Sequence, residues 1–255
     1  MAGFLNRKTP LCQTDVACFE STSRVITDRR LRTLGELDTY IAGAATMNDL
    51  GNSVSKAFTF NAYDIPFALV YFCSVDFGTR IDNGLERRST SESDFSEQDT
   101  LVTYTLQSTV GIPEEHPLAP RVVDHTTSDS YVWPFGKMAK EHTELNMRLS
   151  DQSLEGIRHQ GWPDLPTSAV AVPIFGARES SGKPVMISML IMGLNPRQVF
   201  DDDYLSWFRI CSRHIAAAMN VMRGLENAAR KAEDLAAQNR HRTDFLNTFV
   251  SSVRC

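Results

Sequence analysis

The side chains best suited to metal binding or redox chemistry are spread along the chain instead of being grouped. The sequence has six histidines and five cysteines, and the cysteines are Cys12, Cys18, Cys73, Cys211 and Cys255. It contains no Cys-x-x-Cys and no His-x-x-x-His pair, whereas zinc sites usually take ligands from such closely spaced pairs. The spacing therefore predicts no metal site, and we interpret Cys73 and Cys211 as small core residues.

Motifs that activate a nucleophile or hold a phosphate are absent from the sequence as well. There is no Gly-x-Ser-x-Gly, no Gly-x-x-x-x-Gly-Lys and no Gly-x-Gly-x-x-Gly. These arrangements place a nucleophile on a sharp turn or direct backbone amides at phosphate oxygens. The sequence predicts no catalytic residue, and we expect the chain not to be an enzyme.

The elements that would position any site follow from the hydrophobic pattern. Apolar runs with aromatic and β-branched residues predict strands at residues 67–74, 101–107, 168–175 and 184–193, with Pro173 near an edge or a bulge. Helical spacing predicts helices at residues 24–45, 49–60 and 134–142. Residues 1–22 are expected to form a loop or arm and residues 76–100 an exposed insertion. The order predicts an α+β fold, with an antiparallel sheet covered on one face by the terminal helices.

The C-terminal region predicts one long helix that begins after three aspartates at residues 201–203. Apolar residues recur there in steps of three and four, which is the pattern of a coiled coil. A helix of about forty residues would reach about 60 Å, so its distal half must project or pair with another chain. We expect the first half to pack on the domain itself as well. The residues assigned to a dimer helix are Ile215, Ala218, Met222 and Leu225.

Several segments together resemble the GAF domains of sensory histidine kinases from fungi and bacteria. They are Arg-Arg-Leu-Arg-Thr-Leu-Gly-Glu-Leu at residues 29–37, Asp-Ile-Pro-Phe-Ala-Leu-Val-Tyr at 64–71, Ala-Val-Pro-Ile at 171–174, Gly-Leu-Asn-Pro-Arg at 193–197 and Asp-Asp-Asp-Tyr at 201–204. The resemblance covers about residues 29–230. It implies a GAF-like sheet and a sensory function.

Both flanks extend this resemblance to signalling proteins. Residues 18–30 resemble the closing strand of a PAS domain, and residues 242–255 resemble the beginning of a phosphoacceptor helix with Ser251 near the position of the phosphorylated histidine. Autophosphorylation is therefore not expected. The chain divides into an arm at residues 1–28, a GAF-like sensor domain at 29–225 and a helical signalling linker at 226–255.

The GAF resemblance also implies a ligand pocket between the sheet and the middle part of the chain. A small-molecule site is mostly apolar with a few polar groups. The candidate lining residues in this part of the sequence are Tyr131, Trp133, Phe135, Arg158, His159, Trp162 and Ser168. The alternative is that the tryptophans simply fill the core, because aromatic side chains bury large areas in any domain. The sequence names no cofactor.

Charge and hydropathy limit the partners. The net charge of −5 argues against nucleic acid as the main partner, because phosphate binding favours a basic surface. The sequence has no apolar run long enough to span a membrane and no secretory signal at its start, which predicts a cytoplasmic protein without a membrane partner.

Three functions remain open at this stage. The first is a cytoplasmic GAF-type sensor of two-component signalling that forms a homodimer and binds a small molecule. The second is a non-catalytic fragment that forms heterodimers with histidine kinases. The third is a GAF-fold enzyme such as a methionine sulfoxide reductase that uses Cys73 or Cys211, which is disfavoured because reactive thiols need exposed, electropositive surroundings.

Overall fold

The computed structural model describes residues 13–77, 100–124, 132–157, 160–176 and 185–253. Within these ranges only the backbone is described for residues 13–21, 75–77, 100–101 and 244–253. Three of the candidate pocket residues, Tyr131, Arg158 and His159, lie outside the described residues. Most of the expected insertion at residues 76–100 also lies outside them.

A six-stranded sheet forms the centre of the fold. Its strand order is β3-β2-β1-β6-β5-β4, and every neighbouring pair is antiparallel. The strands are β1 (Ala68–Phe77), β2 (Thr100–Val110), β3 (Val122–Asp124), β4 (Leu145–Arg148), β5 (Ser168–Phe175) and β6 (Met186–Gly193). The predicted antiparallel sheet is confirmed, and the short strands β3 and β4 were not predicted because three or four residues leave no clear alternation.

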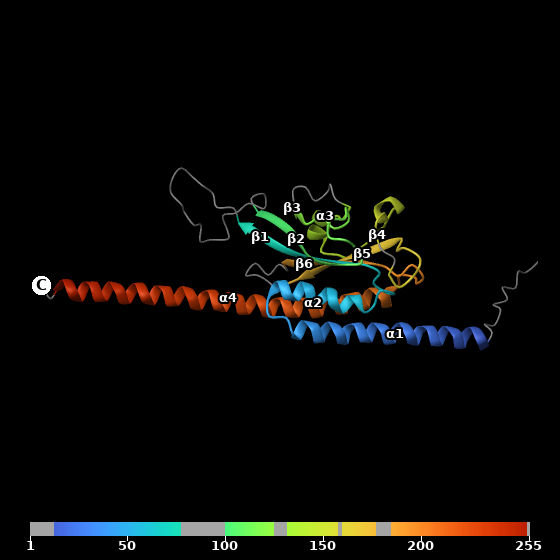
Figure 1. Ribbon diagram of the computed structural model, residues 1–255, viewed down its shortest axis with the longest axis horizontal. Coiled ribbons are helices and arrows are strands. Elements are labelled where there is room, and N and C mark those ends of the chain that lie inside the picture. Colours follow the sequence, from blue (N-terminus) through green and yellow to red (C-terminus); the bar gives the residue numbers. More distant parts are fainter. Residues whose placement is uncertain (1–12, 78–99, 125–131, 158–159, 177–184, 254–255) are drawn as a thin grey trace, which may run out of the picture.

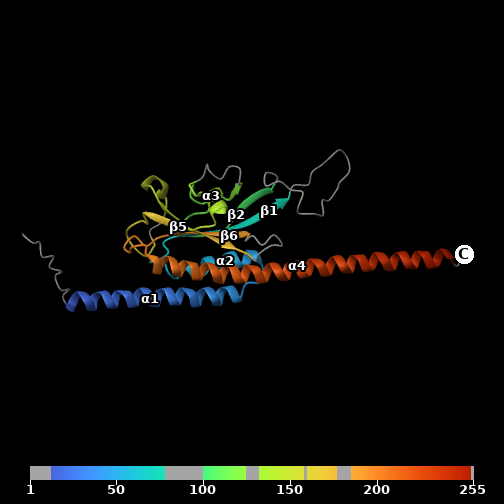
Figure 2. The same cartoon turned by 180° about the vertical axis from the view of Figure 1, so that it is seen from behind.

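Helices lie on both sides of this sheet. They are α1 (Gln13–Ala42), α2 (Met47–Thr59), α3 (Phe135–Glu141) and α4 (Asp202–Val253), with a short 3-10 helix η3 (Asp151–Leu154). Helices α2 and α4 pack on one face of the sheet, and α1 packs on α2 and α4 as an outer layer (Figures 1 and 2). Helix α3 lies on the opposite face. The α+β prediction is confirmed, but α1 contacts its neighbouring helices more than the sheet.

Two predictions at the N-terminal end were wrong. Helix α1 begins at Gln13, so residues 13–22 are not a loop, and residues 18–30 are helical where the PAS resemblance implied a strand. An apolar repeat at helical spacing shows which side of a helix is buried, not whether a segment is helical. Only one face of the outer helix α1 is covered by other elements. A helix with little buried surface therefore gave a weak signal in its first turns.

Helix α2 shows how local sequence sets its position on the sheet. The Thr46 side chain accepts a hydrogen bond from the Asp49 backbone amide while the Asp49 carboxylate accepts one from the Thr46 amide, which is a capping box. A Cβ atom on Gly51 would approach the Gln107 side chain to 2.8 Å. Any larger residue there would push α2 away from β2.

Helix α4 has two halves with different surroundings. Its 52 residues begin on the sheet, where Phe208, Cys211 and Ile215 are buried. From Gly224 to Thr243 every side chain is exposed, and this half extends beyond the domain (Figure 1). The prediction of a long helix that packs first and then projects is confirmed.

The pairing of strand β5 accommodates Pro173. Strand β4 pairs with β5 only along Ser168–Ala171, and the pairing with β6 shifts register between Ile174 and Phe175. A proline removes one amide hydrogen-bond donor, which is tolerated where a neighbouring strand has ended. The expected edge-like or bulged position of Pro173 is confirmed.

Candidate functional site

The expected aromatic pocket is a packed core in this structure. Trp133 and Phe135 are fully buried, and the Trp133 indole donates a hydrogen bond to the Leu118 carbonyl. The Phe135 ring lies 5.1 Å from the Tyr71 ring and 4.9 Å from the Tyr104 ring. These two residues therefore fill the space beneath α3 instead of lining an open pocket, because rings packed this closely leave no room for a ligand.

Trp162 lies in a different part of the molecule from Trp133. It is half-buried, and its indole donates a hydrogen bond of 3.1 Å to the Tyr63 carbonyl. The Arg197 guanidinium lies 4.5 Å above the Trp162 ring, which is a cation–π contact. The grouping of Trp162 with Trp133 was therefore wrong, because sequence proximity does not fix which loop a side chain packs against.

Ser168 has a third location, at the start of β5. There it lines a hollow together with Arg148 of the neighbouring strand β4. The described members of the predicted pocket are thus separated into a core pair, a surface tryptophan and a hollow at the sheet edge. No single cavity brings these described residues together.

The two described thiols lack the properties of redox nucleophiles. Cys73 and Cys211 are both buried, and burial raises the pKa of each thiol to about 12. A thiol with such a pKa carries almost no thiolate near neutral pH, and the thiolate is the reactive form. The interpretation of Cys73 and Cys211 as core residues is confirmed.

The described residues contain no group of three or more histidine, cysteine, aspartate or glutamate side chains that could hold a metal ion. Among the described helices, none combines the length and the apolar character that crossing a membrane requires.

A buried carboxylate, Asp64, is the centre of the most extensive polar cluster. It lies in the loop between α2 and β1 and is fully buried. The Arg29 guanidinium of α1 donates to its two oxygens at 3.0 and 3.2 Å, and the side-chain amides of Asn61 and Asn195 each donate at 3.1 Å. The carboxylate is therefore fully paired, as a buried charge requires.

The same cluster continues into α4 through Tyr204. The Tyr204 hydroxyl donates to the Asp64 carbonyl and accepts from the Asn195 backbone amide. Burial raises the pKa of this hydroxyl above its ordinary value, so it remains a donor. We call Arg29, Asn61, Asp64, Asn195 and Tyr204 the Asp64 junction. It connects α1, the loop before β1 and the loop before α4.

Arg30, next to Arg29 on α1, contacts α4 in another way. Its guanidinium lies 4.4 Å above the Tyr204 ring and 5.4 Å from the Trp207 ring. Its Nε and Nη2 atoms are buried without a hydrogen-bond partner among the described residues. The Trp207 indole donates to the Arg30 carbonyl at 3.2 Å. Helix α1 is thus held to α4 by the Trp207–Arg30 hydrogen bond and a non-directional cation–π stack, while the Arg29–Asp64 ion pair holds α1 to the loop before β1.

Sequence reasoning named four segments of the Asp64 junction but not the contacts between them. Residues 29–37, 64–71, 193–197 and 201–204 were singled out for their family resemblance, and Asp64 received no role. One signal was available, because Asp64 directly precedes an almost wholly apolar strand. A carboxylate in such a position must find a buried partner.

The residues predicted to form a dimer helix are divided by the structure. Ile215 and Met222 are buried against the chain's own sheet, and Ala218 is partly buried beside them. Leu225 alone is exposed, with 67% of its surface accessible. The assignment of Ile215 and Met222 to a surface between two chains was wrong, because the sheet already covers that face of α4.

A different apolar row lies on the outward face of α4. We call it the outer stripe; its members are Ile210, Ala217, Val221, Leu225, Ala228, Ala232 and Leu235. From Ala217 onward they are spaced in steps of three and four, and Ile210 lies two turns before Ala217. All are exposed, Val221 with 63% and Leu235 with 60% of the surface accessible. The Asp38 carboxylate of α1 lies 2.5 Å from the His214 imidazole of α4 beside this row.

Comparisons with known proteins give only distant matches. No protein-family model matches the sequence, and no curated protein matches it significantly. The similar solved structures include the GAF domain of a phosphoenolpyruvate-protein phosphotransferase from Coxiella burnetii, with 12% identity, a TM-score of 0.48 and coverage of 78% of this chain and 97% of that chain.

Two further structures are similar at the same level. One is the GAF domain of a protein assigned as a sensor histidine kinase from Pseudomonas syringae pathovar tomato, with 14% identity, a TM-score of 0.43 and coverage of 84% and 99% of the two chains. The other is the fRMsr protein of Staphylococcus aureus, with 13% identity, a TM-score of 0.44 and coverage of 74% and 94%. At these values no ligand, partner or activity can be transferred to this chain.

Proposed function

We propose that this chain is a cytoplasmic, non-catalytic sensor domain of two-component signalling that acts as a homodimer through its terminal helices. The observation that carries the proposal is the outer stripe. It runs along the outward face of α4 and continues where this helix leaves the sheet. An exposed apolar row with this spacing has the pattern of a coiled-coil seam, and its burial needs a second helix.

The composition of the outer stripe favours close approach of two helices. Val221, Leu225 and Leu235 are large apolar side chains that are each more than half exposed, and burying one fully contributes about 1.5–3 kcal/mol. The alanines between them allow the helix backbones to come near each other. Two such stripes in register would form the seam of a parallel dimer.

The Asp64 junction supports a role in signal transmission. It holds α1 to the loop before β1 and to the start of α4, so a displacement of either helix must strain the other. The Arg30 contact with Tyr204 and Trp207 has no directional hydrogen bond from its buried Nε and Nη2 atoms. The stack itself would tolerate a small shift of α1 along α4, whereas the hydrogen bond from the Trp207 indole to the Arg30 carbonyl would have to break and re-form. Packed helices can switch between two such arrangements.

Light scattering on purified protein tests the dimer. The wild-type chain is expected at twice its mass of 28.5 kDa, and the double variant Val221→Glu and Leu225→Glu is expected as a monomer, because four charges would face each other across the seam. The matched control is Asn227→Glu with Gln238→Glu, which adds the same charge to exposed positions outside the outer stripe. This control should remain dimeric.

The outcomes separate the alternatives. A monomeric wild-type chain at tens of micromolar, or a dimer that survives both stripe substitutions, would contradict the proposal. Co-purification of a histidine kinase that is lost only in the stripe variant would instead favour the heterodimer hypothesis, which uses the same surface.

A further inference from the structure

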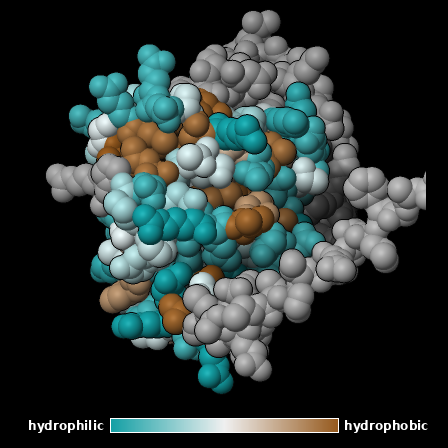
Figure 3. Space-filling view, turned by 90° about the vertical axis from the view of Figure 1, so that its right-hand side faces the viewer, coloured by the Kyte–Doolittle hydropathy of each residue, from teal (hydrophilic) through white to brown (hydrophobic). Residues whose placement is uncertain are grey.

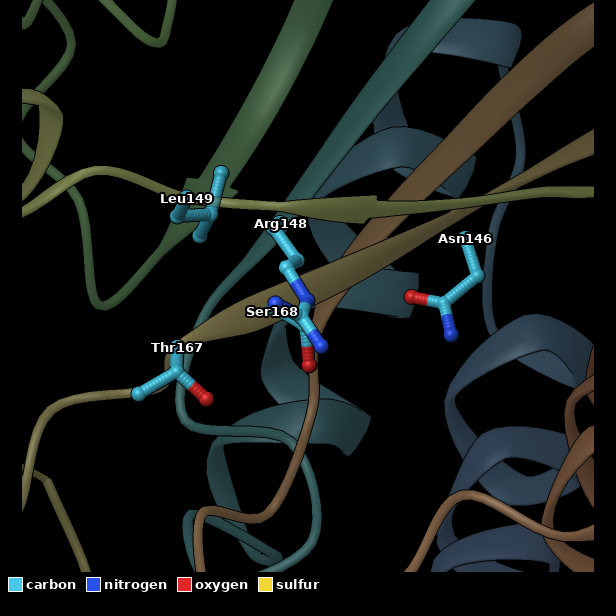
Figure 4. A pocket seen from close by; sticks show the side chains of 5 residues that line it. All are labelled: Asn146, Arg148, Leu149, Thr167 and Ser168. Atoms are coloured by element: carbon cyan, nitrogen blue, oxygen red, sulfur yellow. The ribbon is translucent and has the colours of Figure 1, made fainter.

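A polar hollow of about 610 Å³ lies at the β4 edge of the sheet. Its lining residues come from two neighbouring strands and are Asn146, Arg148, Leu149, Thr167 and Ser168. Figure 4 shows the side chains of Asn146, Arg148, Thr167 and Ser168 arranged around one space. The end of the molecule seen in Figure 3 mixes hydrophilic side chains with separate apolar areas. A volume of this size is typical of small-molecule sites.

The sheet itself positions these side chains. Arg148 and Ser168 are directly paired in the β4–β5 ladder, and Asn146 lies two residues before Arg148 on the same face. The alternate residues, Leu145 and Met147, pack into the aromatic core on the opposite face. Because cross-strand neighbours are held by backbone hydrogen bonds, the polar groups are arranged before any ligand arrives.

The chemistry of the lining favours an anion. Its polar side chains offer guanidinium, amide and hydroxyl donors, and no lining residue carries a carboxylate. Arg148 forms no ion pair with another described residue. A guanidinium can bind a carboxylate or a phosphate through two parallel hydrogen bonds. An unpaired arginine of this kind is notable in a chain whose net charge is −5.

Helix α4 places an arginine next to strand β4. Arg209 pairs with Glu144, which directly precedes β4 and lies two residues before Asn146, at 2.6 and 3.1 Å. No residue of α4 is among the residues that line the hollow, so α4 is linked to it through this ion pair and the neighbouring lining residue Asn146.

We propose that this hollow is a binding site for a small organic anion that carries a carboxylate or phosphate group. The site rests on the proposed sensor function, for which the anion would be the input. Arg148 would bind the anionic group, and Asn146, Thr167 and Ser168 would donate further hydrogen bonds. The bound anion would also compete with Glu144 for Arg209, and so connects the site to the packing of α4.

Calorimetric titration of the full chain with succinate and with inorganic phosphate tests the site, and the two arms distinguish the two kinds of anion. Arg148→Ala should weaken binding by about tenfold or more, as expected for loss of a charged hydrogen bond. Arg148→Lys should bind with intermediate affinity, because lysine lacks the two-pronged geometry. Arg121→Ala, which removes an exposed arginine near Glu114 at the opposite edge, should leave binding unchanged.

A third substitution tests the link to α4. Glu144→Gln removes the competitor for Arg209 and should tighten anion binding by about threefold, a size typical of one exposed ion pair. A merely structural role for Glu144 would leave the affinity equal or weaker. Unfolding curves for all variants verify that they are folded, since Arg148 is exposed and its loss is not expected to destabilise the sheet.

The failure of this inference is distinguishable from failure of the proposed function. If neither anion binds the wild-type chain, or if Arg148→Ala binds as tightly as wild type, the anion site is wrong. The light-scattering result for the outer stripe does not depend on an anion. A dimeric protein that binds neither succinate nor phosphate would overturn only the anion site.

Discussion

The two faces of the sheet are built on different principles. The face beneath α3 is closed by large rings, with Trp133, Phe135 and Tyr104 all fully buried. The face beneath α2 and α4 is also apolar at its centre, but it ends at the buried charge of Asp64 on one side and at the open polar hollow beside Arg148 on another. The aromatic face thus supplies stability, whereas the helical face carries the features that can respond to a partner or ligand.

Most of the polar groups on the aromatic face form hydrogen bonds with nearby backbone carbonyls. The Tyr71 hydroxyl donates to the Pro120 carbonyl at 3.0 Å, and the Trp133 indole donates to the Leu118 carbonyl. The Tyr104 hydroxyl has no partner among the described residues, and burial raises its pKa above the ordinary value. None of these groups is charged at neutral pH.

The largest expected effect is the loss of stability when a ring is removed from the aromatic face. Trp133→Ala should lower the free energy of unfolding by about 3–5 kcal/mol, because it leaves a cavity in a packed core. Trp162→Ala is the matched control, since that ring is half-buried on the surface and its loss should cost about 1–2 kcal/mol. Urea denaturation measures both values. Equal costs would mean that the aromatic face is not the more tightly packed region.

The next effect concerns the charge buried on the helical face. Asp64→Asn keeps the volume but removes the charge partner of Arg29, and should cost about 2–3 kcal/mol. Asp164→Asn is a matched control, because Asp164 and Arg197 form an ion pair of 2.8 Å whose side chains are 56% and 48% exposed. Such a pair contributes about 0–1 kcal/mol.

Hydrogen exchange sharpens the Asp64 prediction. If the Asp64 junction holds α1 in place, the amides of α1 should exchange faster in Asp64→Asn than in Asp164→Asn. A uniform increase over the whole chain would indicate general loss of stability and would not support a role in connecting the helices.

These contrasts also show what the sequence could and could not predict. Strands β1, β2, β5 and β6 were predictable, because their runs of apolar residues are long and bounded by turn residues. That α4 is one long helix was predictable from its spacing in the same way, although its 52 residues exceed the expected length of about forty. The apolar repeat depends on how much of an element is buried. The outer helix α1 buries one face only, and strands β3 and β4 are short, so the sequence pattern did not reveal their bounds.

The candidate site was harder to predict for a geometric reason. The aromatic residues of the predicted pocket share one stretch of sequence, but Trp133 packs under α3 and Trp162 packs against Tyr63. The Asp64 junction joins residues up to 175 positions apart, from Arg29 to Tyr204. Their convergence depends on the antiparallel order of the strands, which brings the loop before β1 next to the loop after β6. Composition identifies side chains that can form a site, and topology decides which of them meet.

The smallest expected effect is the pH dependence of stability that comes from the Glu144–Arg209 pair at the edge of the helical face. The hydrogen bonds from Arg209 hold the pKa of Glu144 below its ordinary value of 4.5. The resulting stabilisation is fully present above that value and is lost as the pH falls through the folded-state pKa. Melting temperatures of wild type and Glu144→Gln should therefore differ by a constant amount above pH about 5, and the difference should shrink as the pH falls below about 4.5.

A double-variant comparison isolates this pair from the other carboxylates. In an Arg209→Gln background the Glu144 carboxylate has lost its hydrogen-bond donor, so Glu144→Gln should no longer change the pH dependence. If the difference between the two Glu144 forms persists in this background, then another group controls the titration of Glu144. Arg209 would then not be shared between Glu144 and an anion in the hollow, and the helical face would lose its proposed link from the sheet edge to α4.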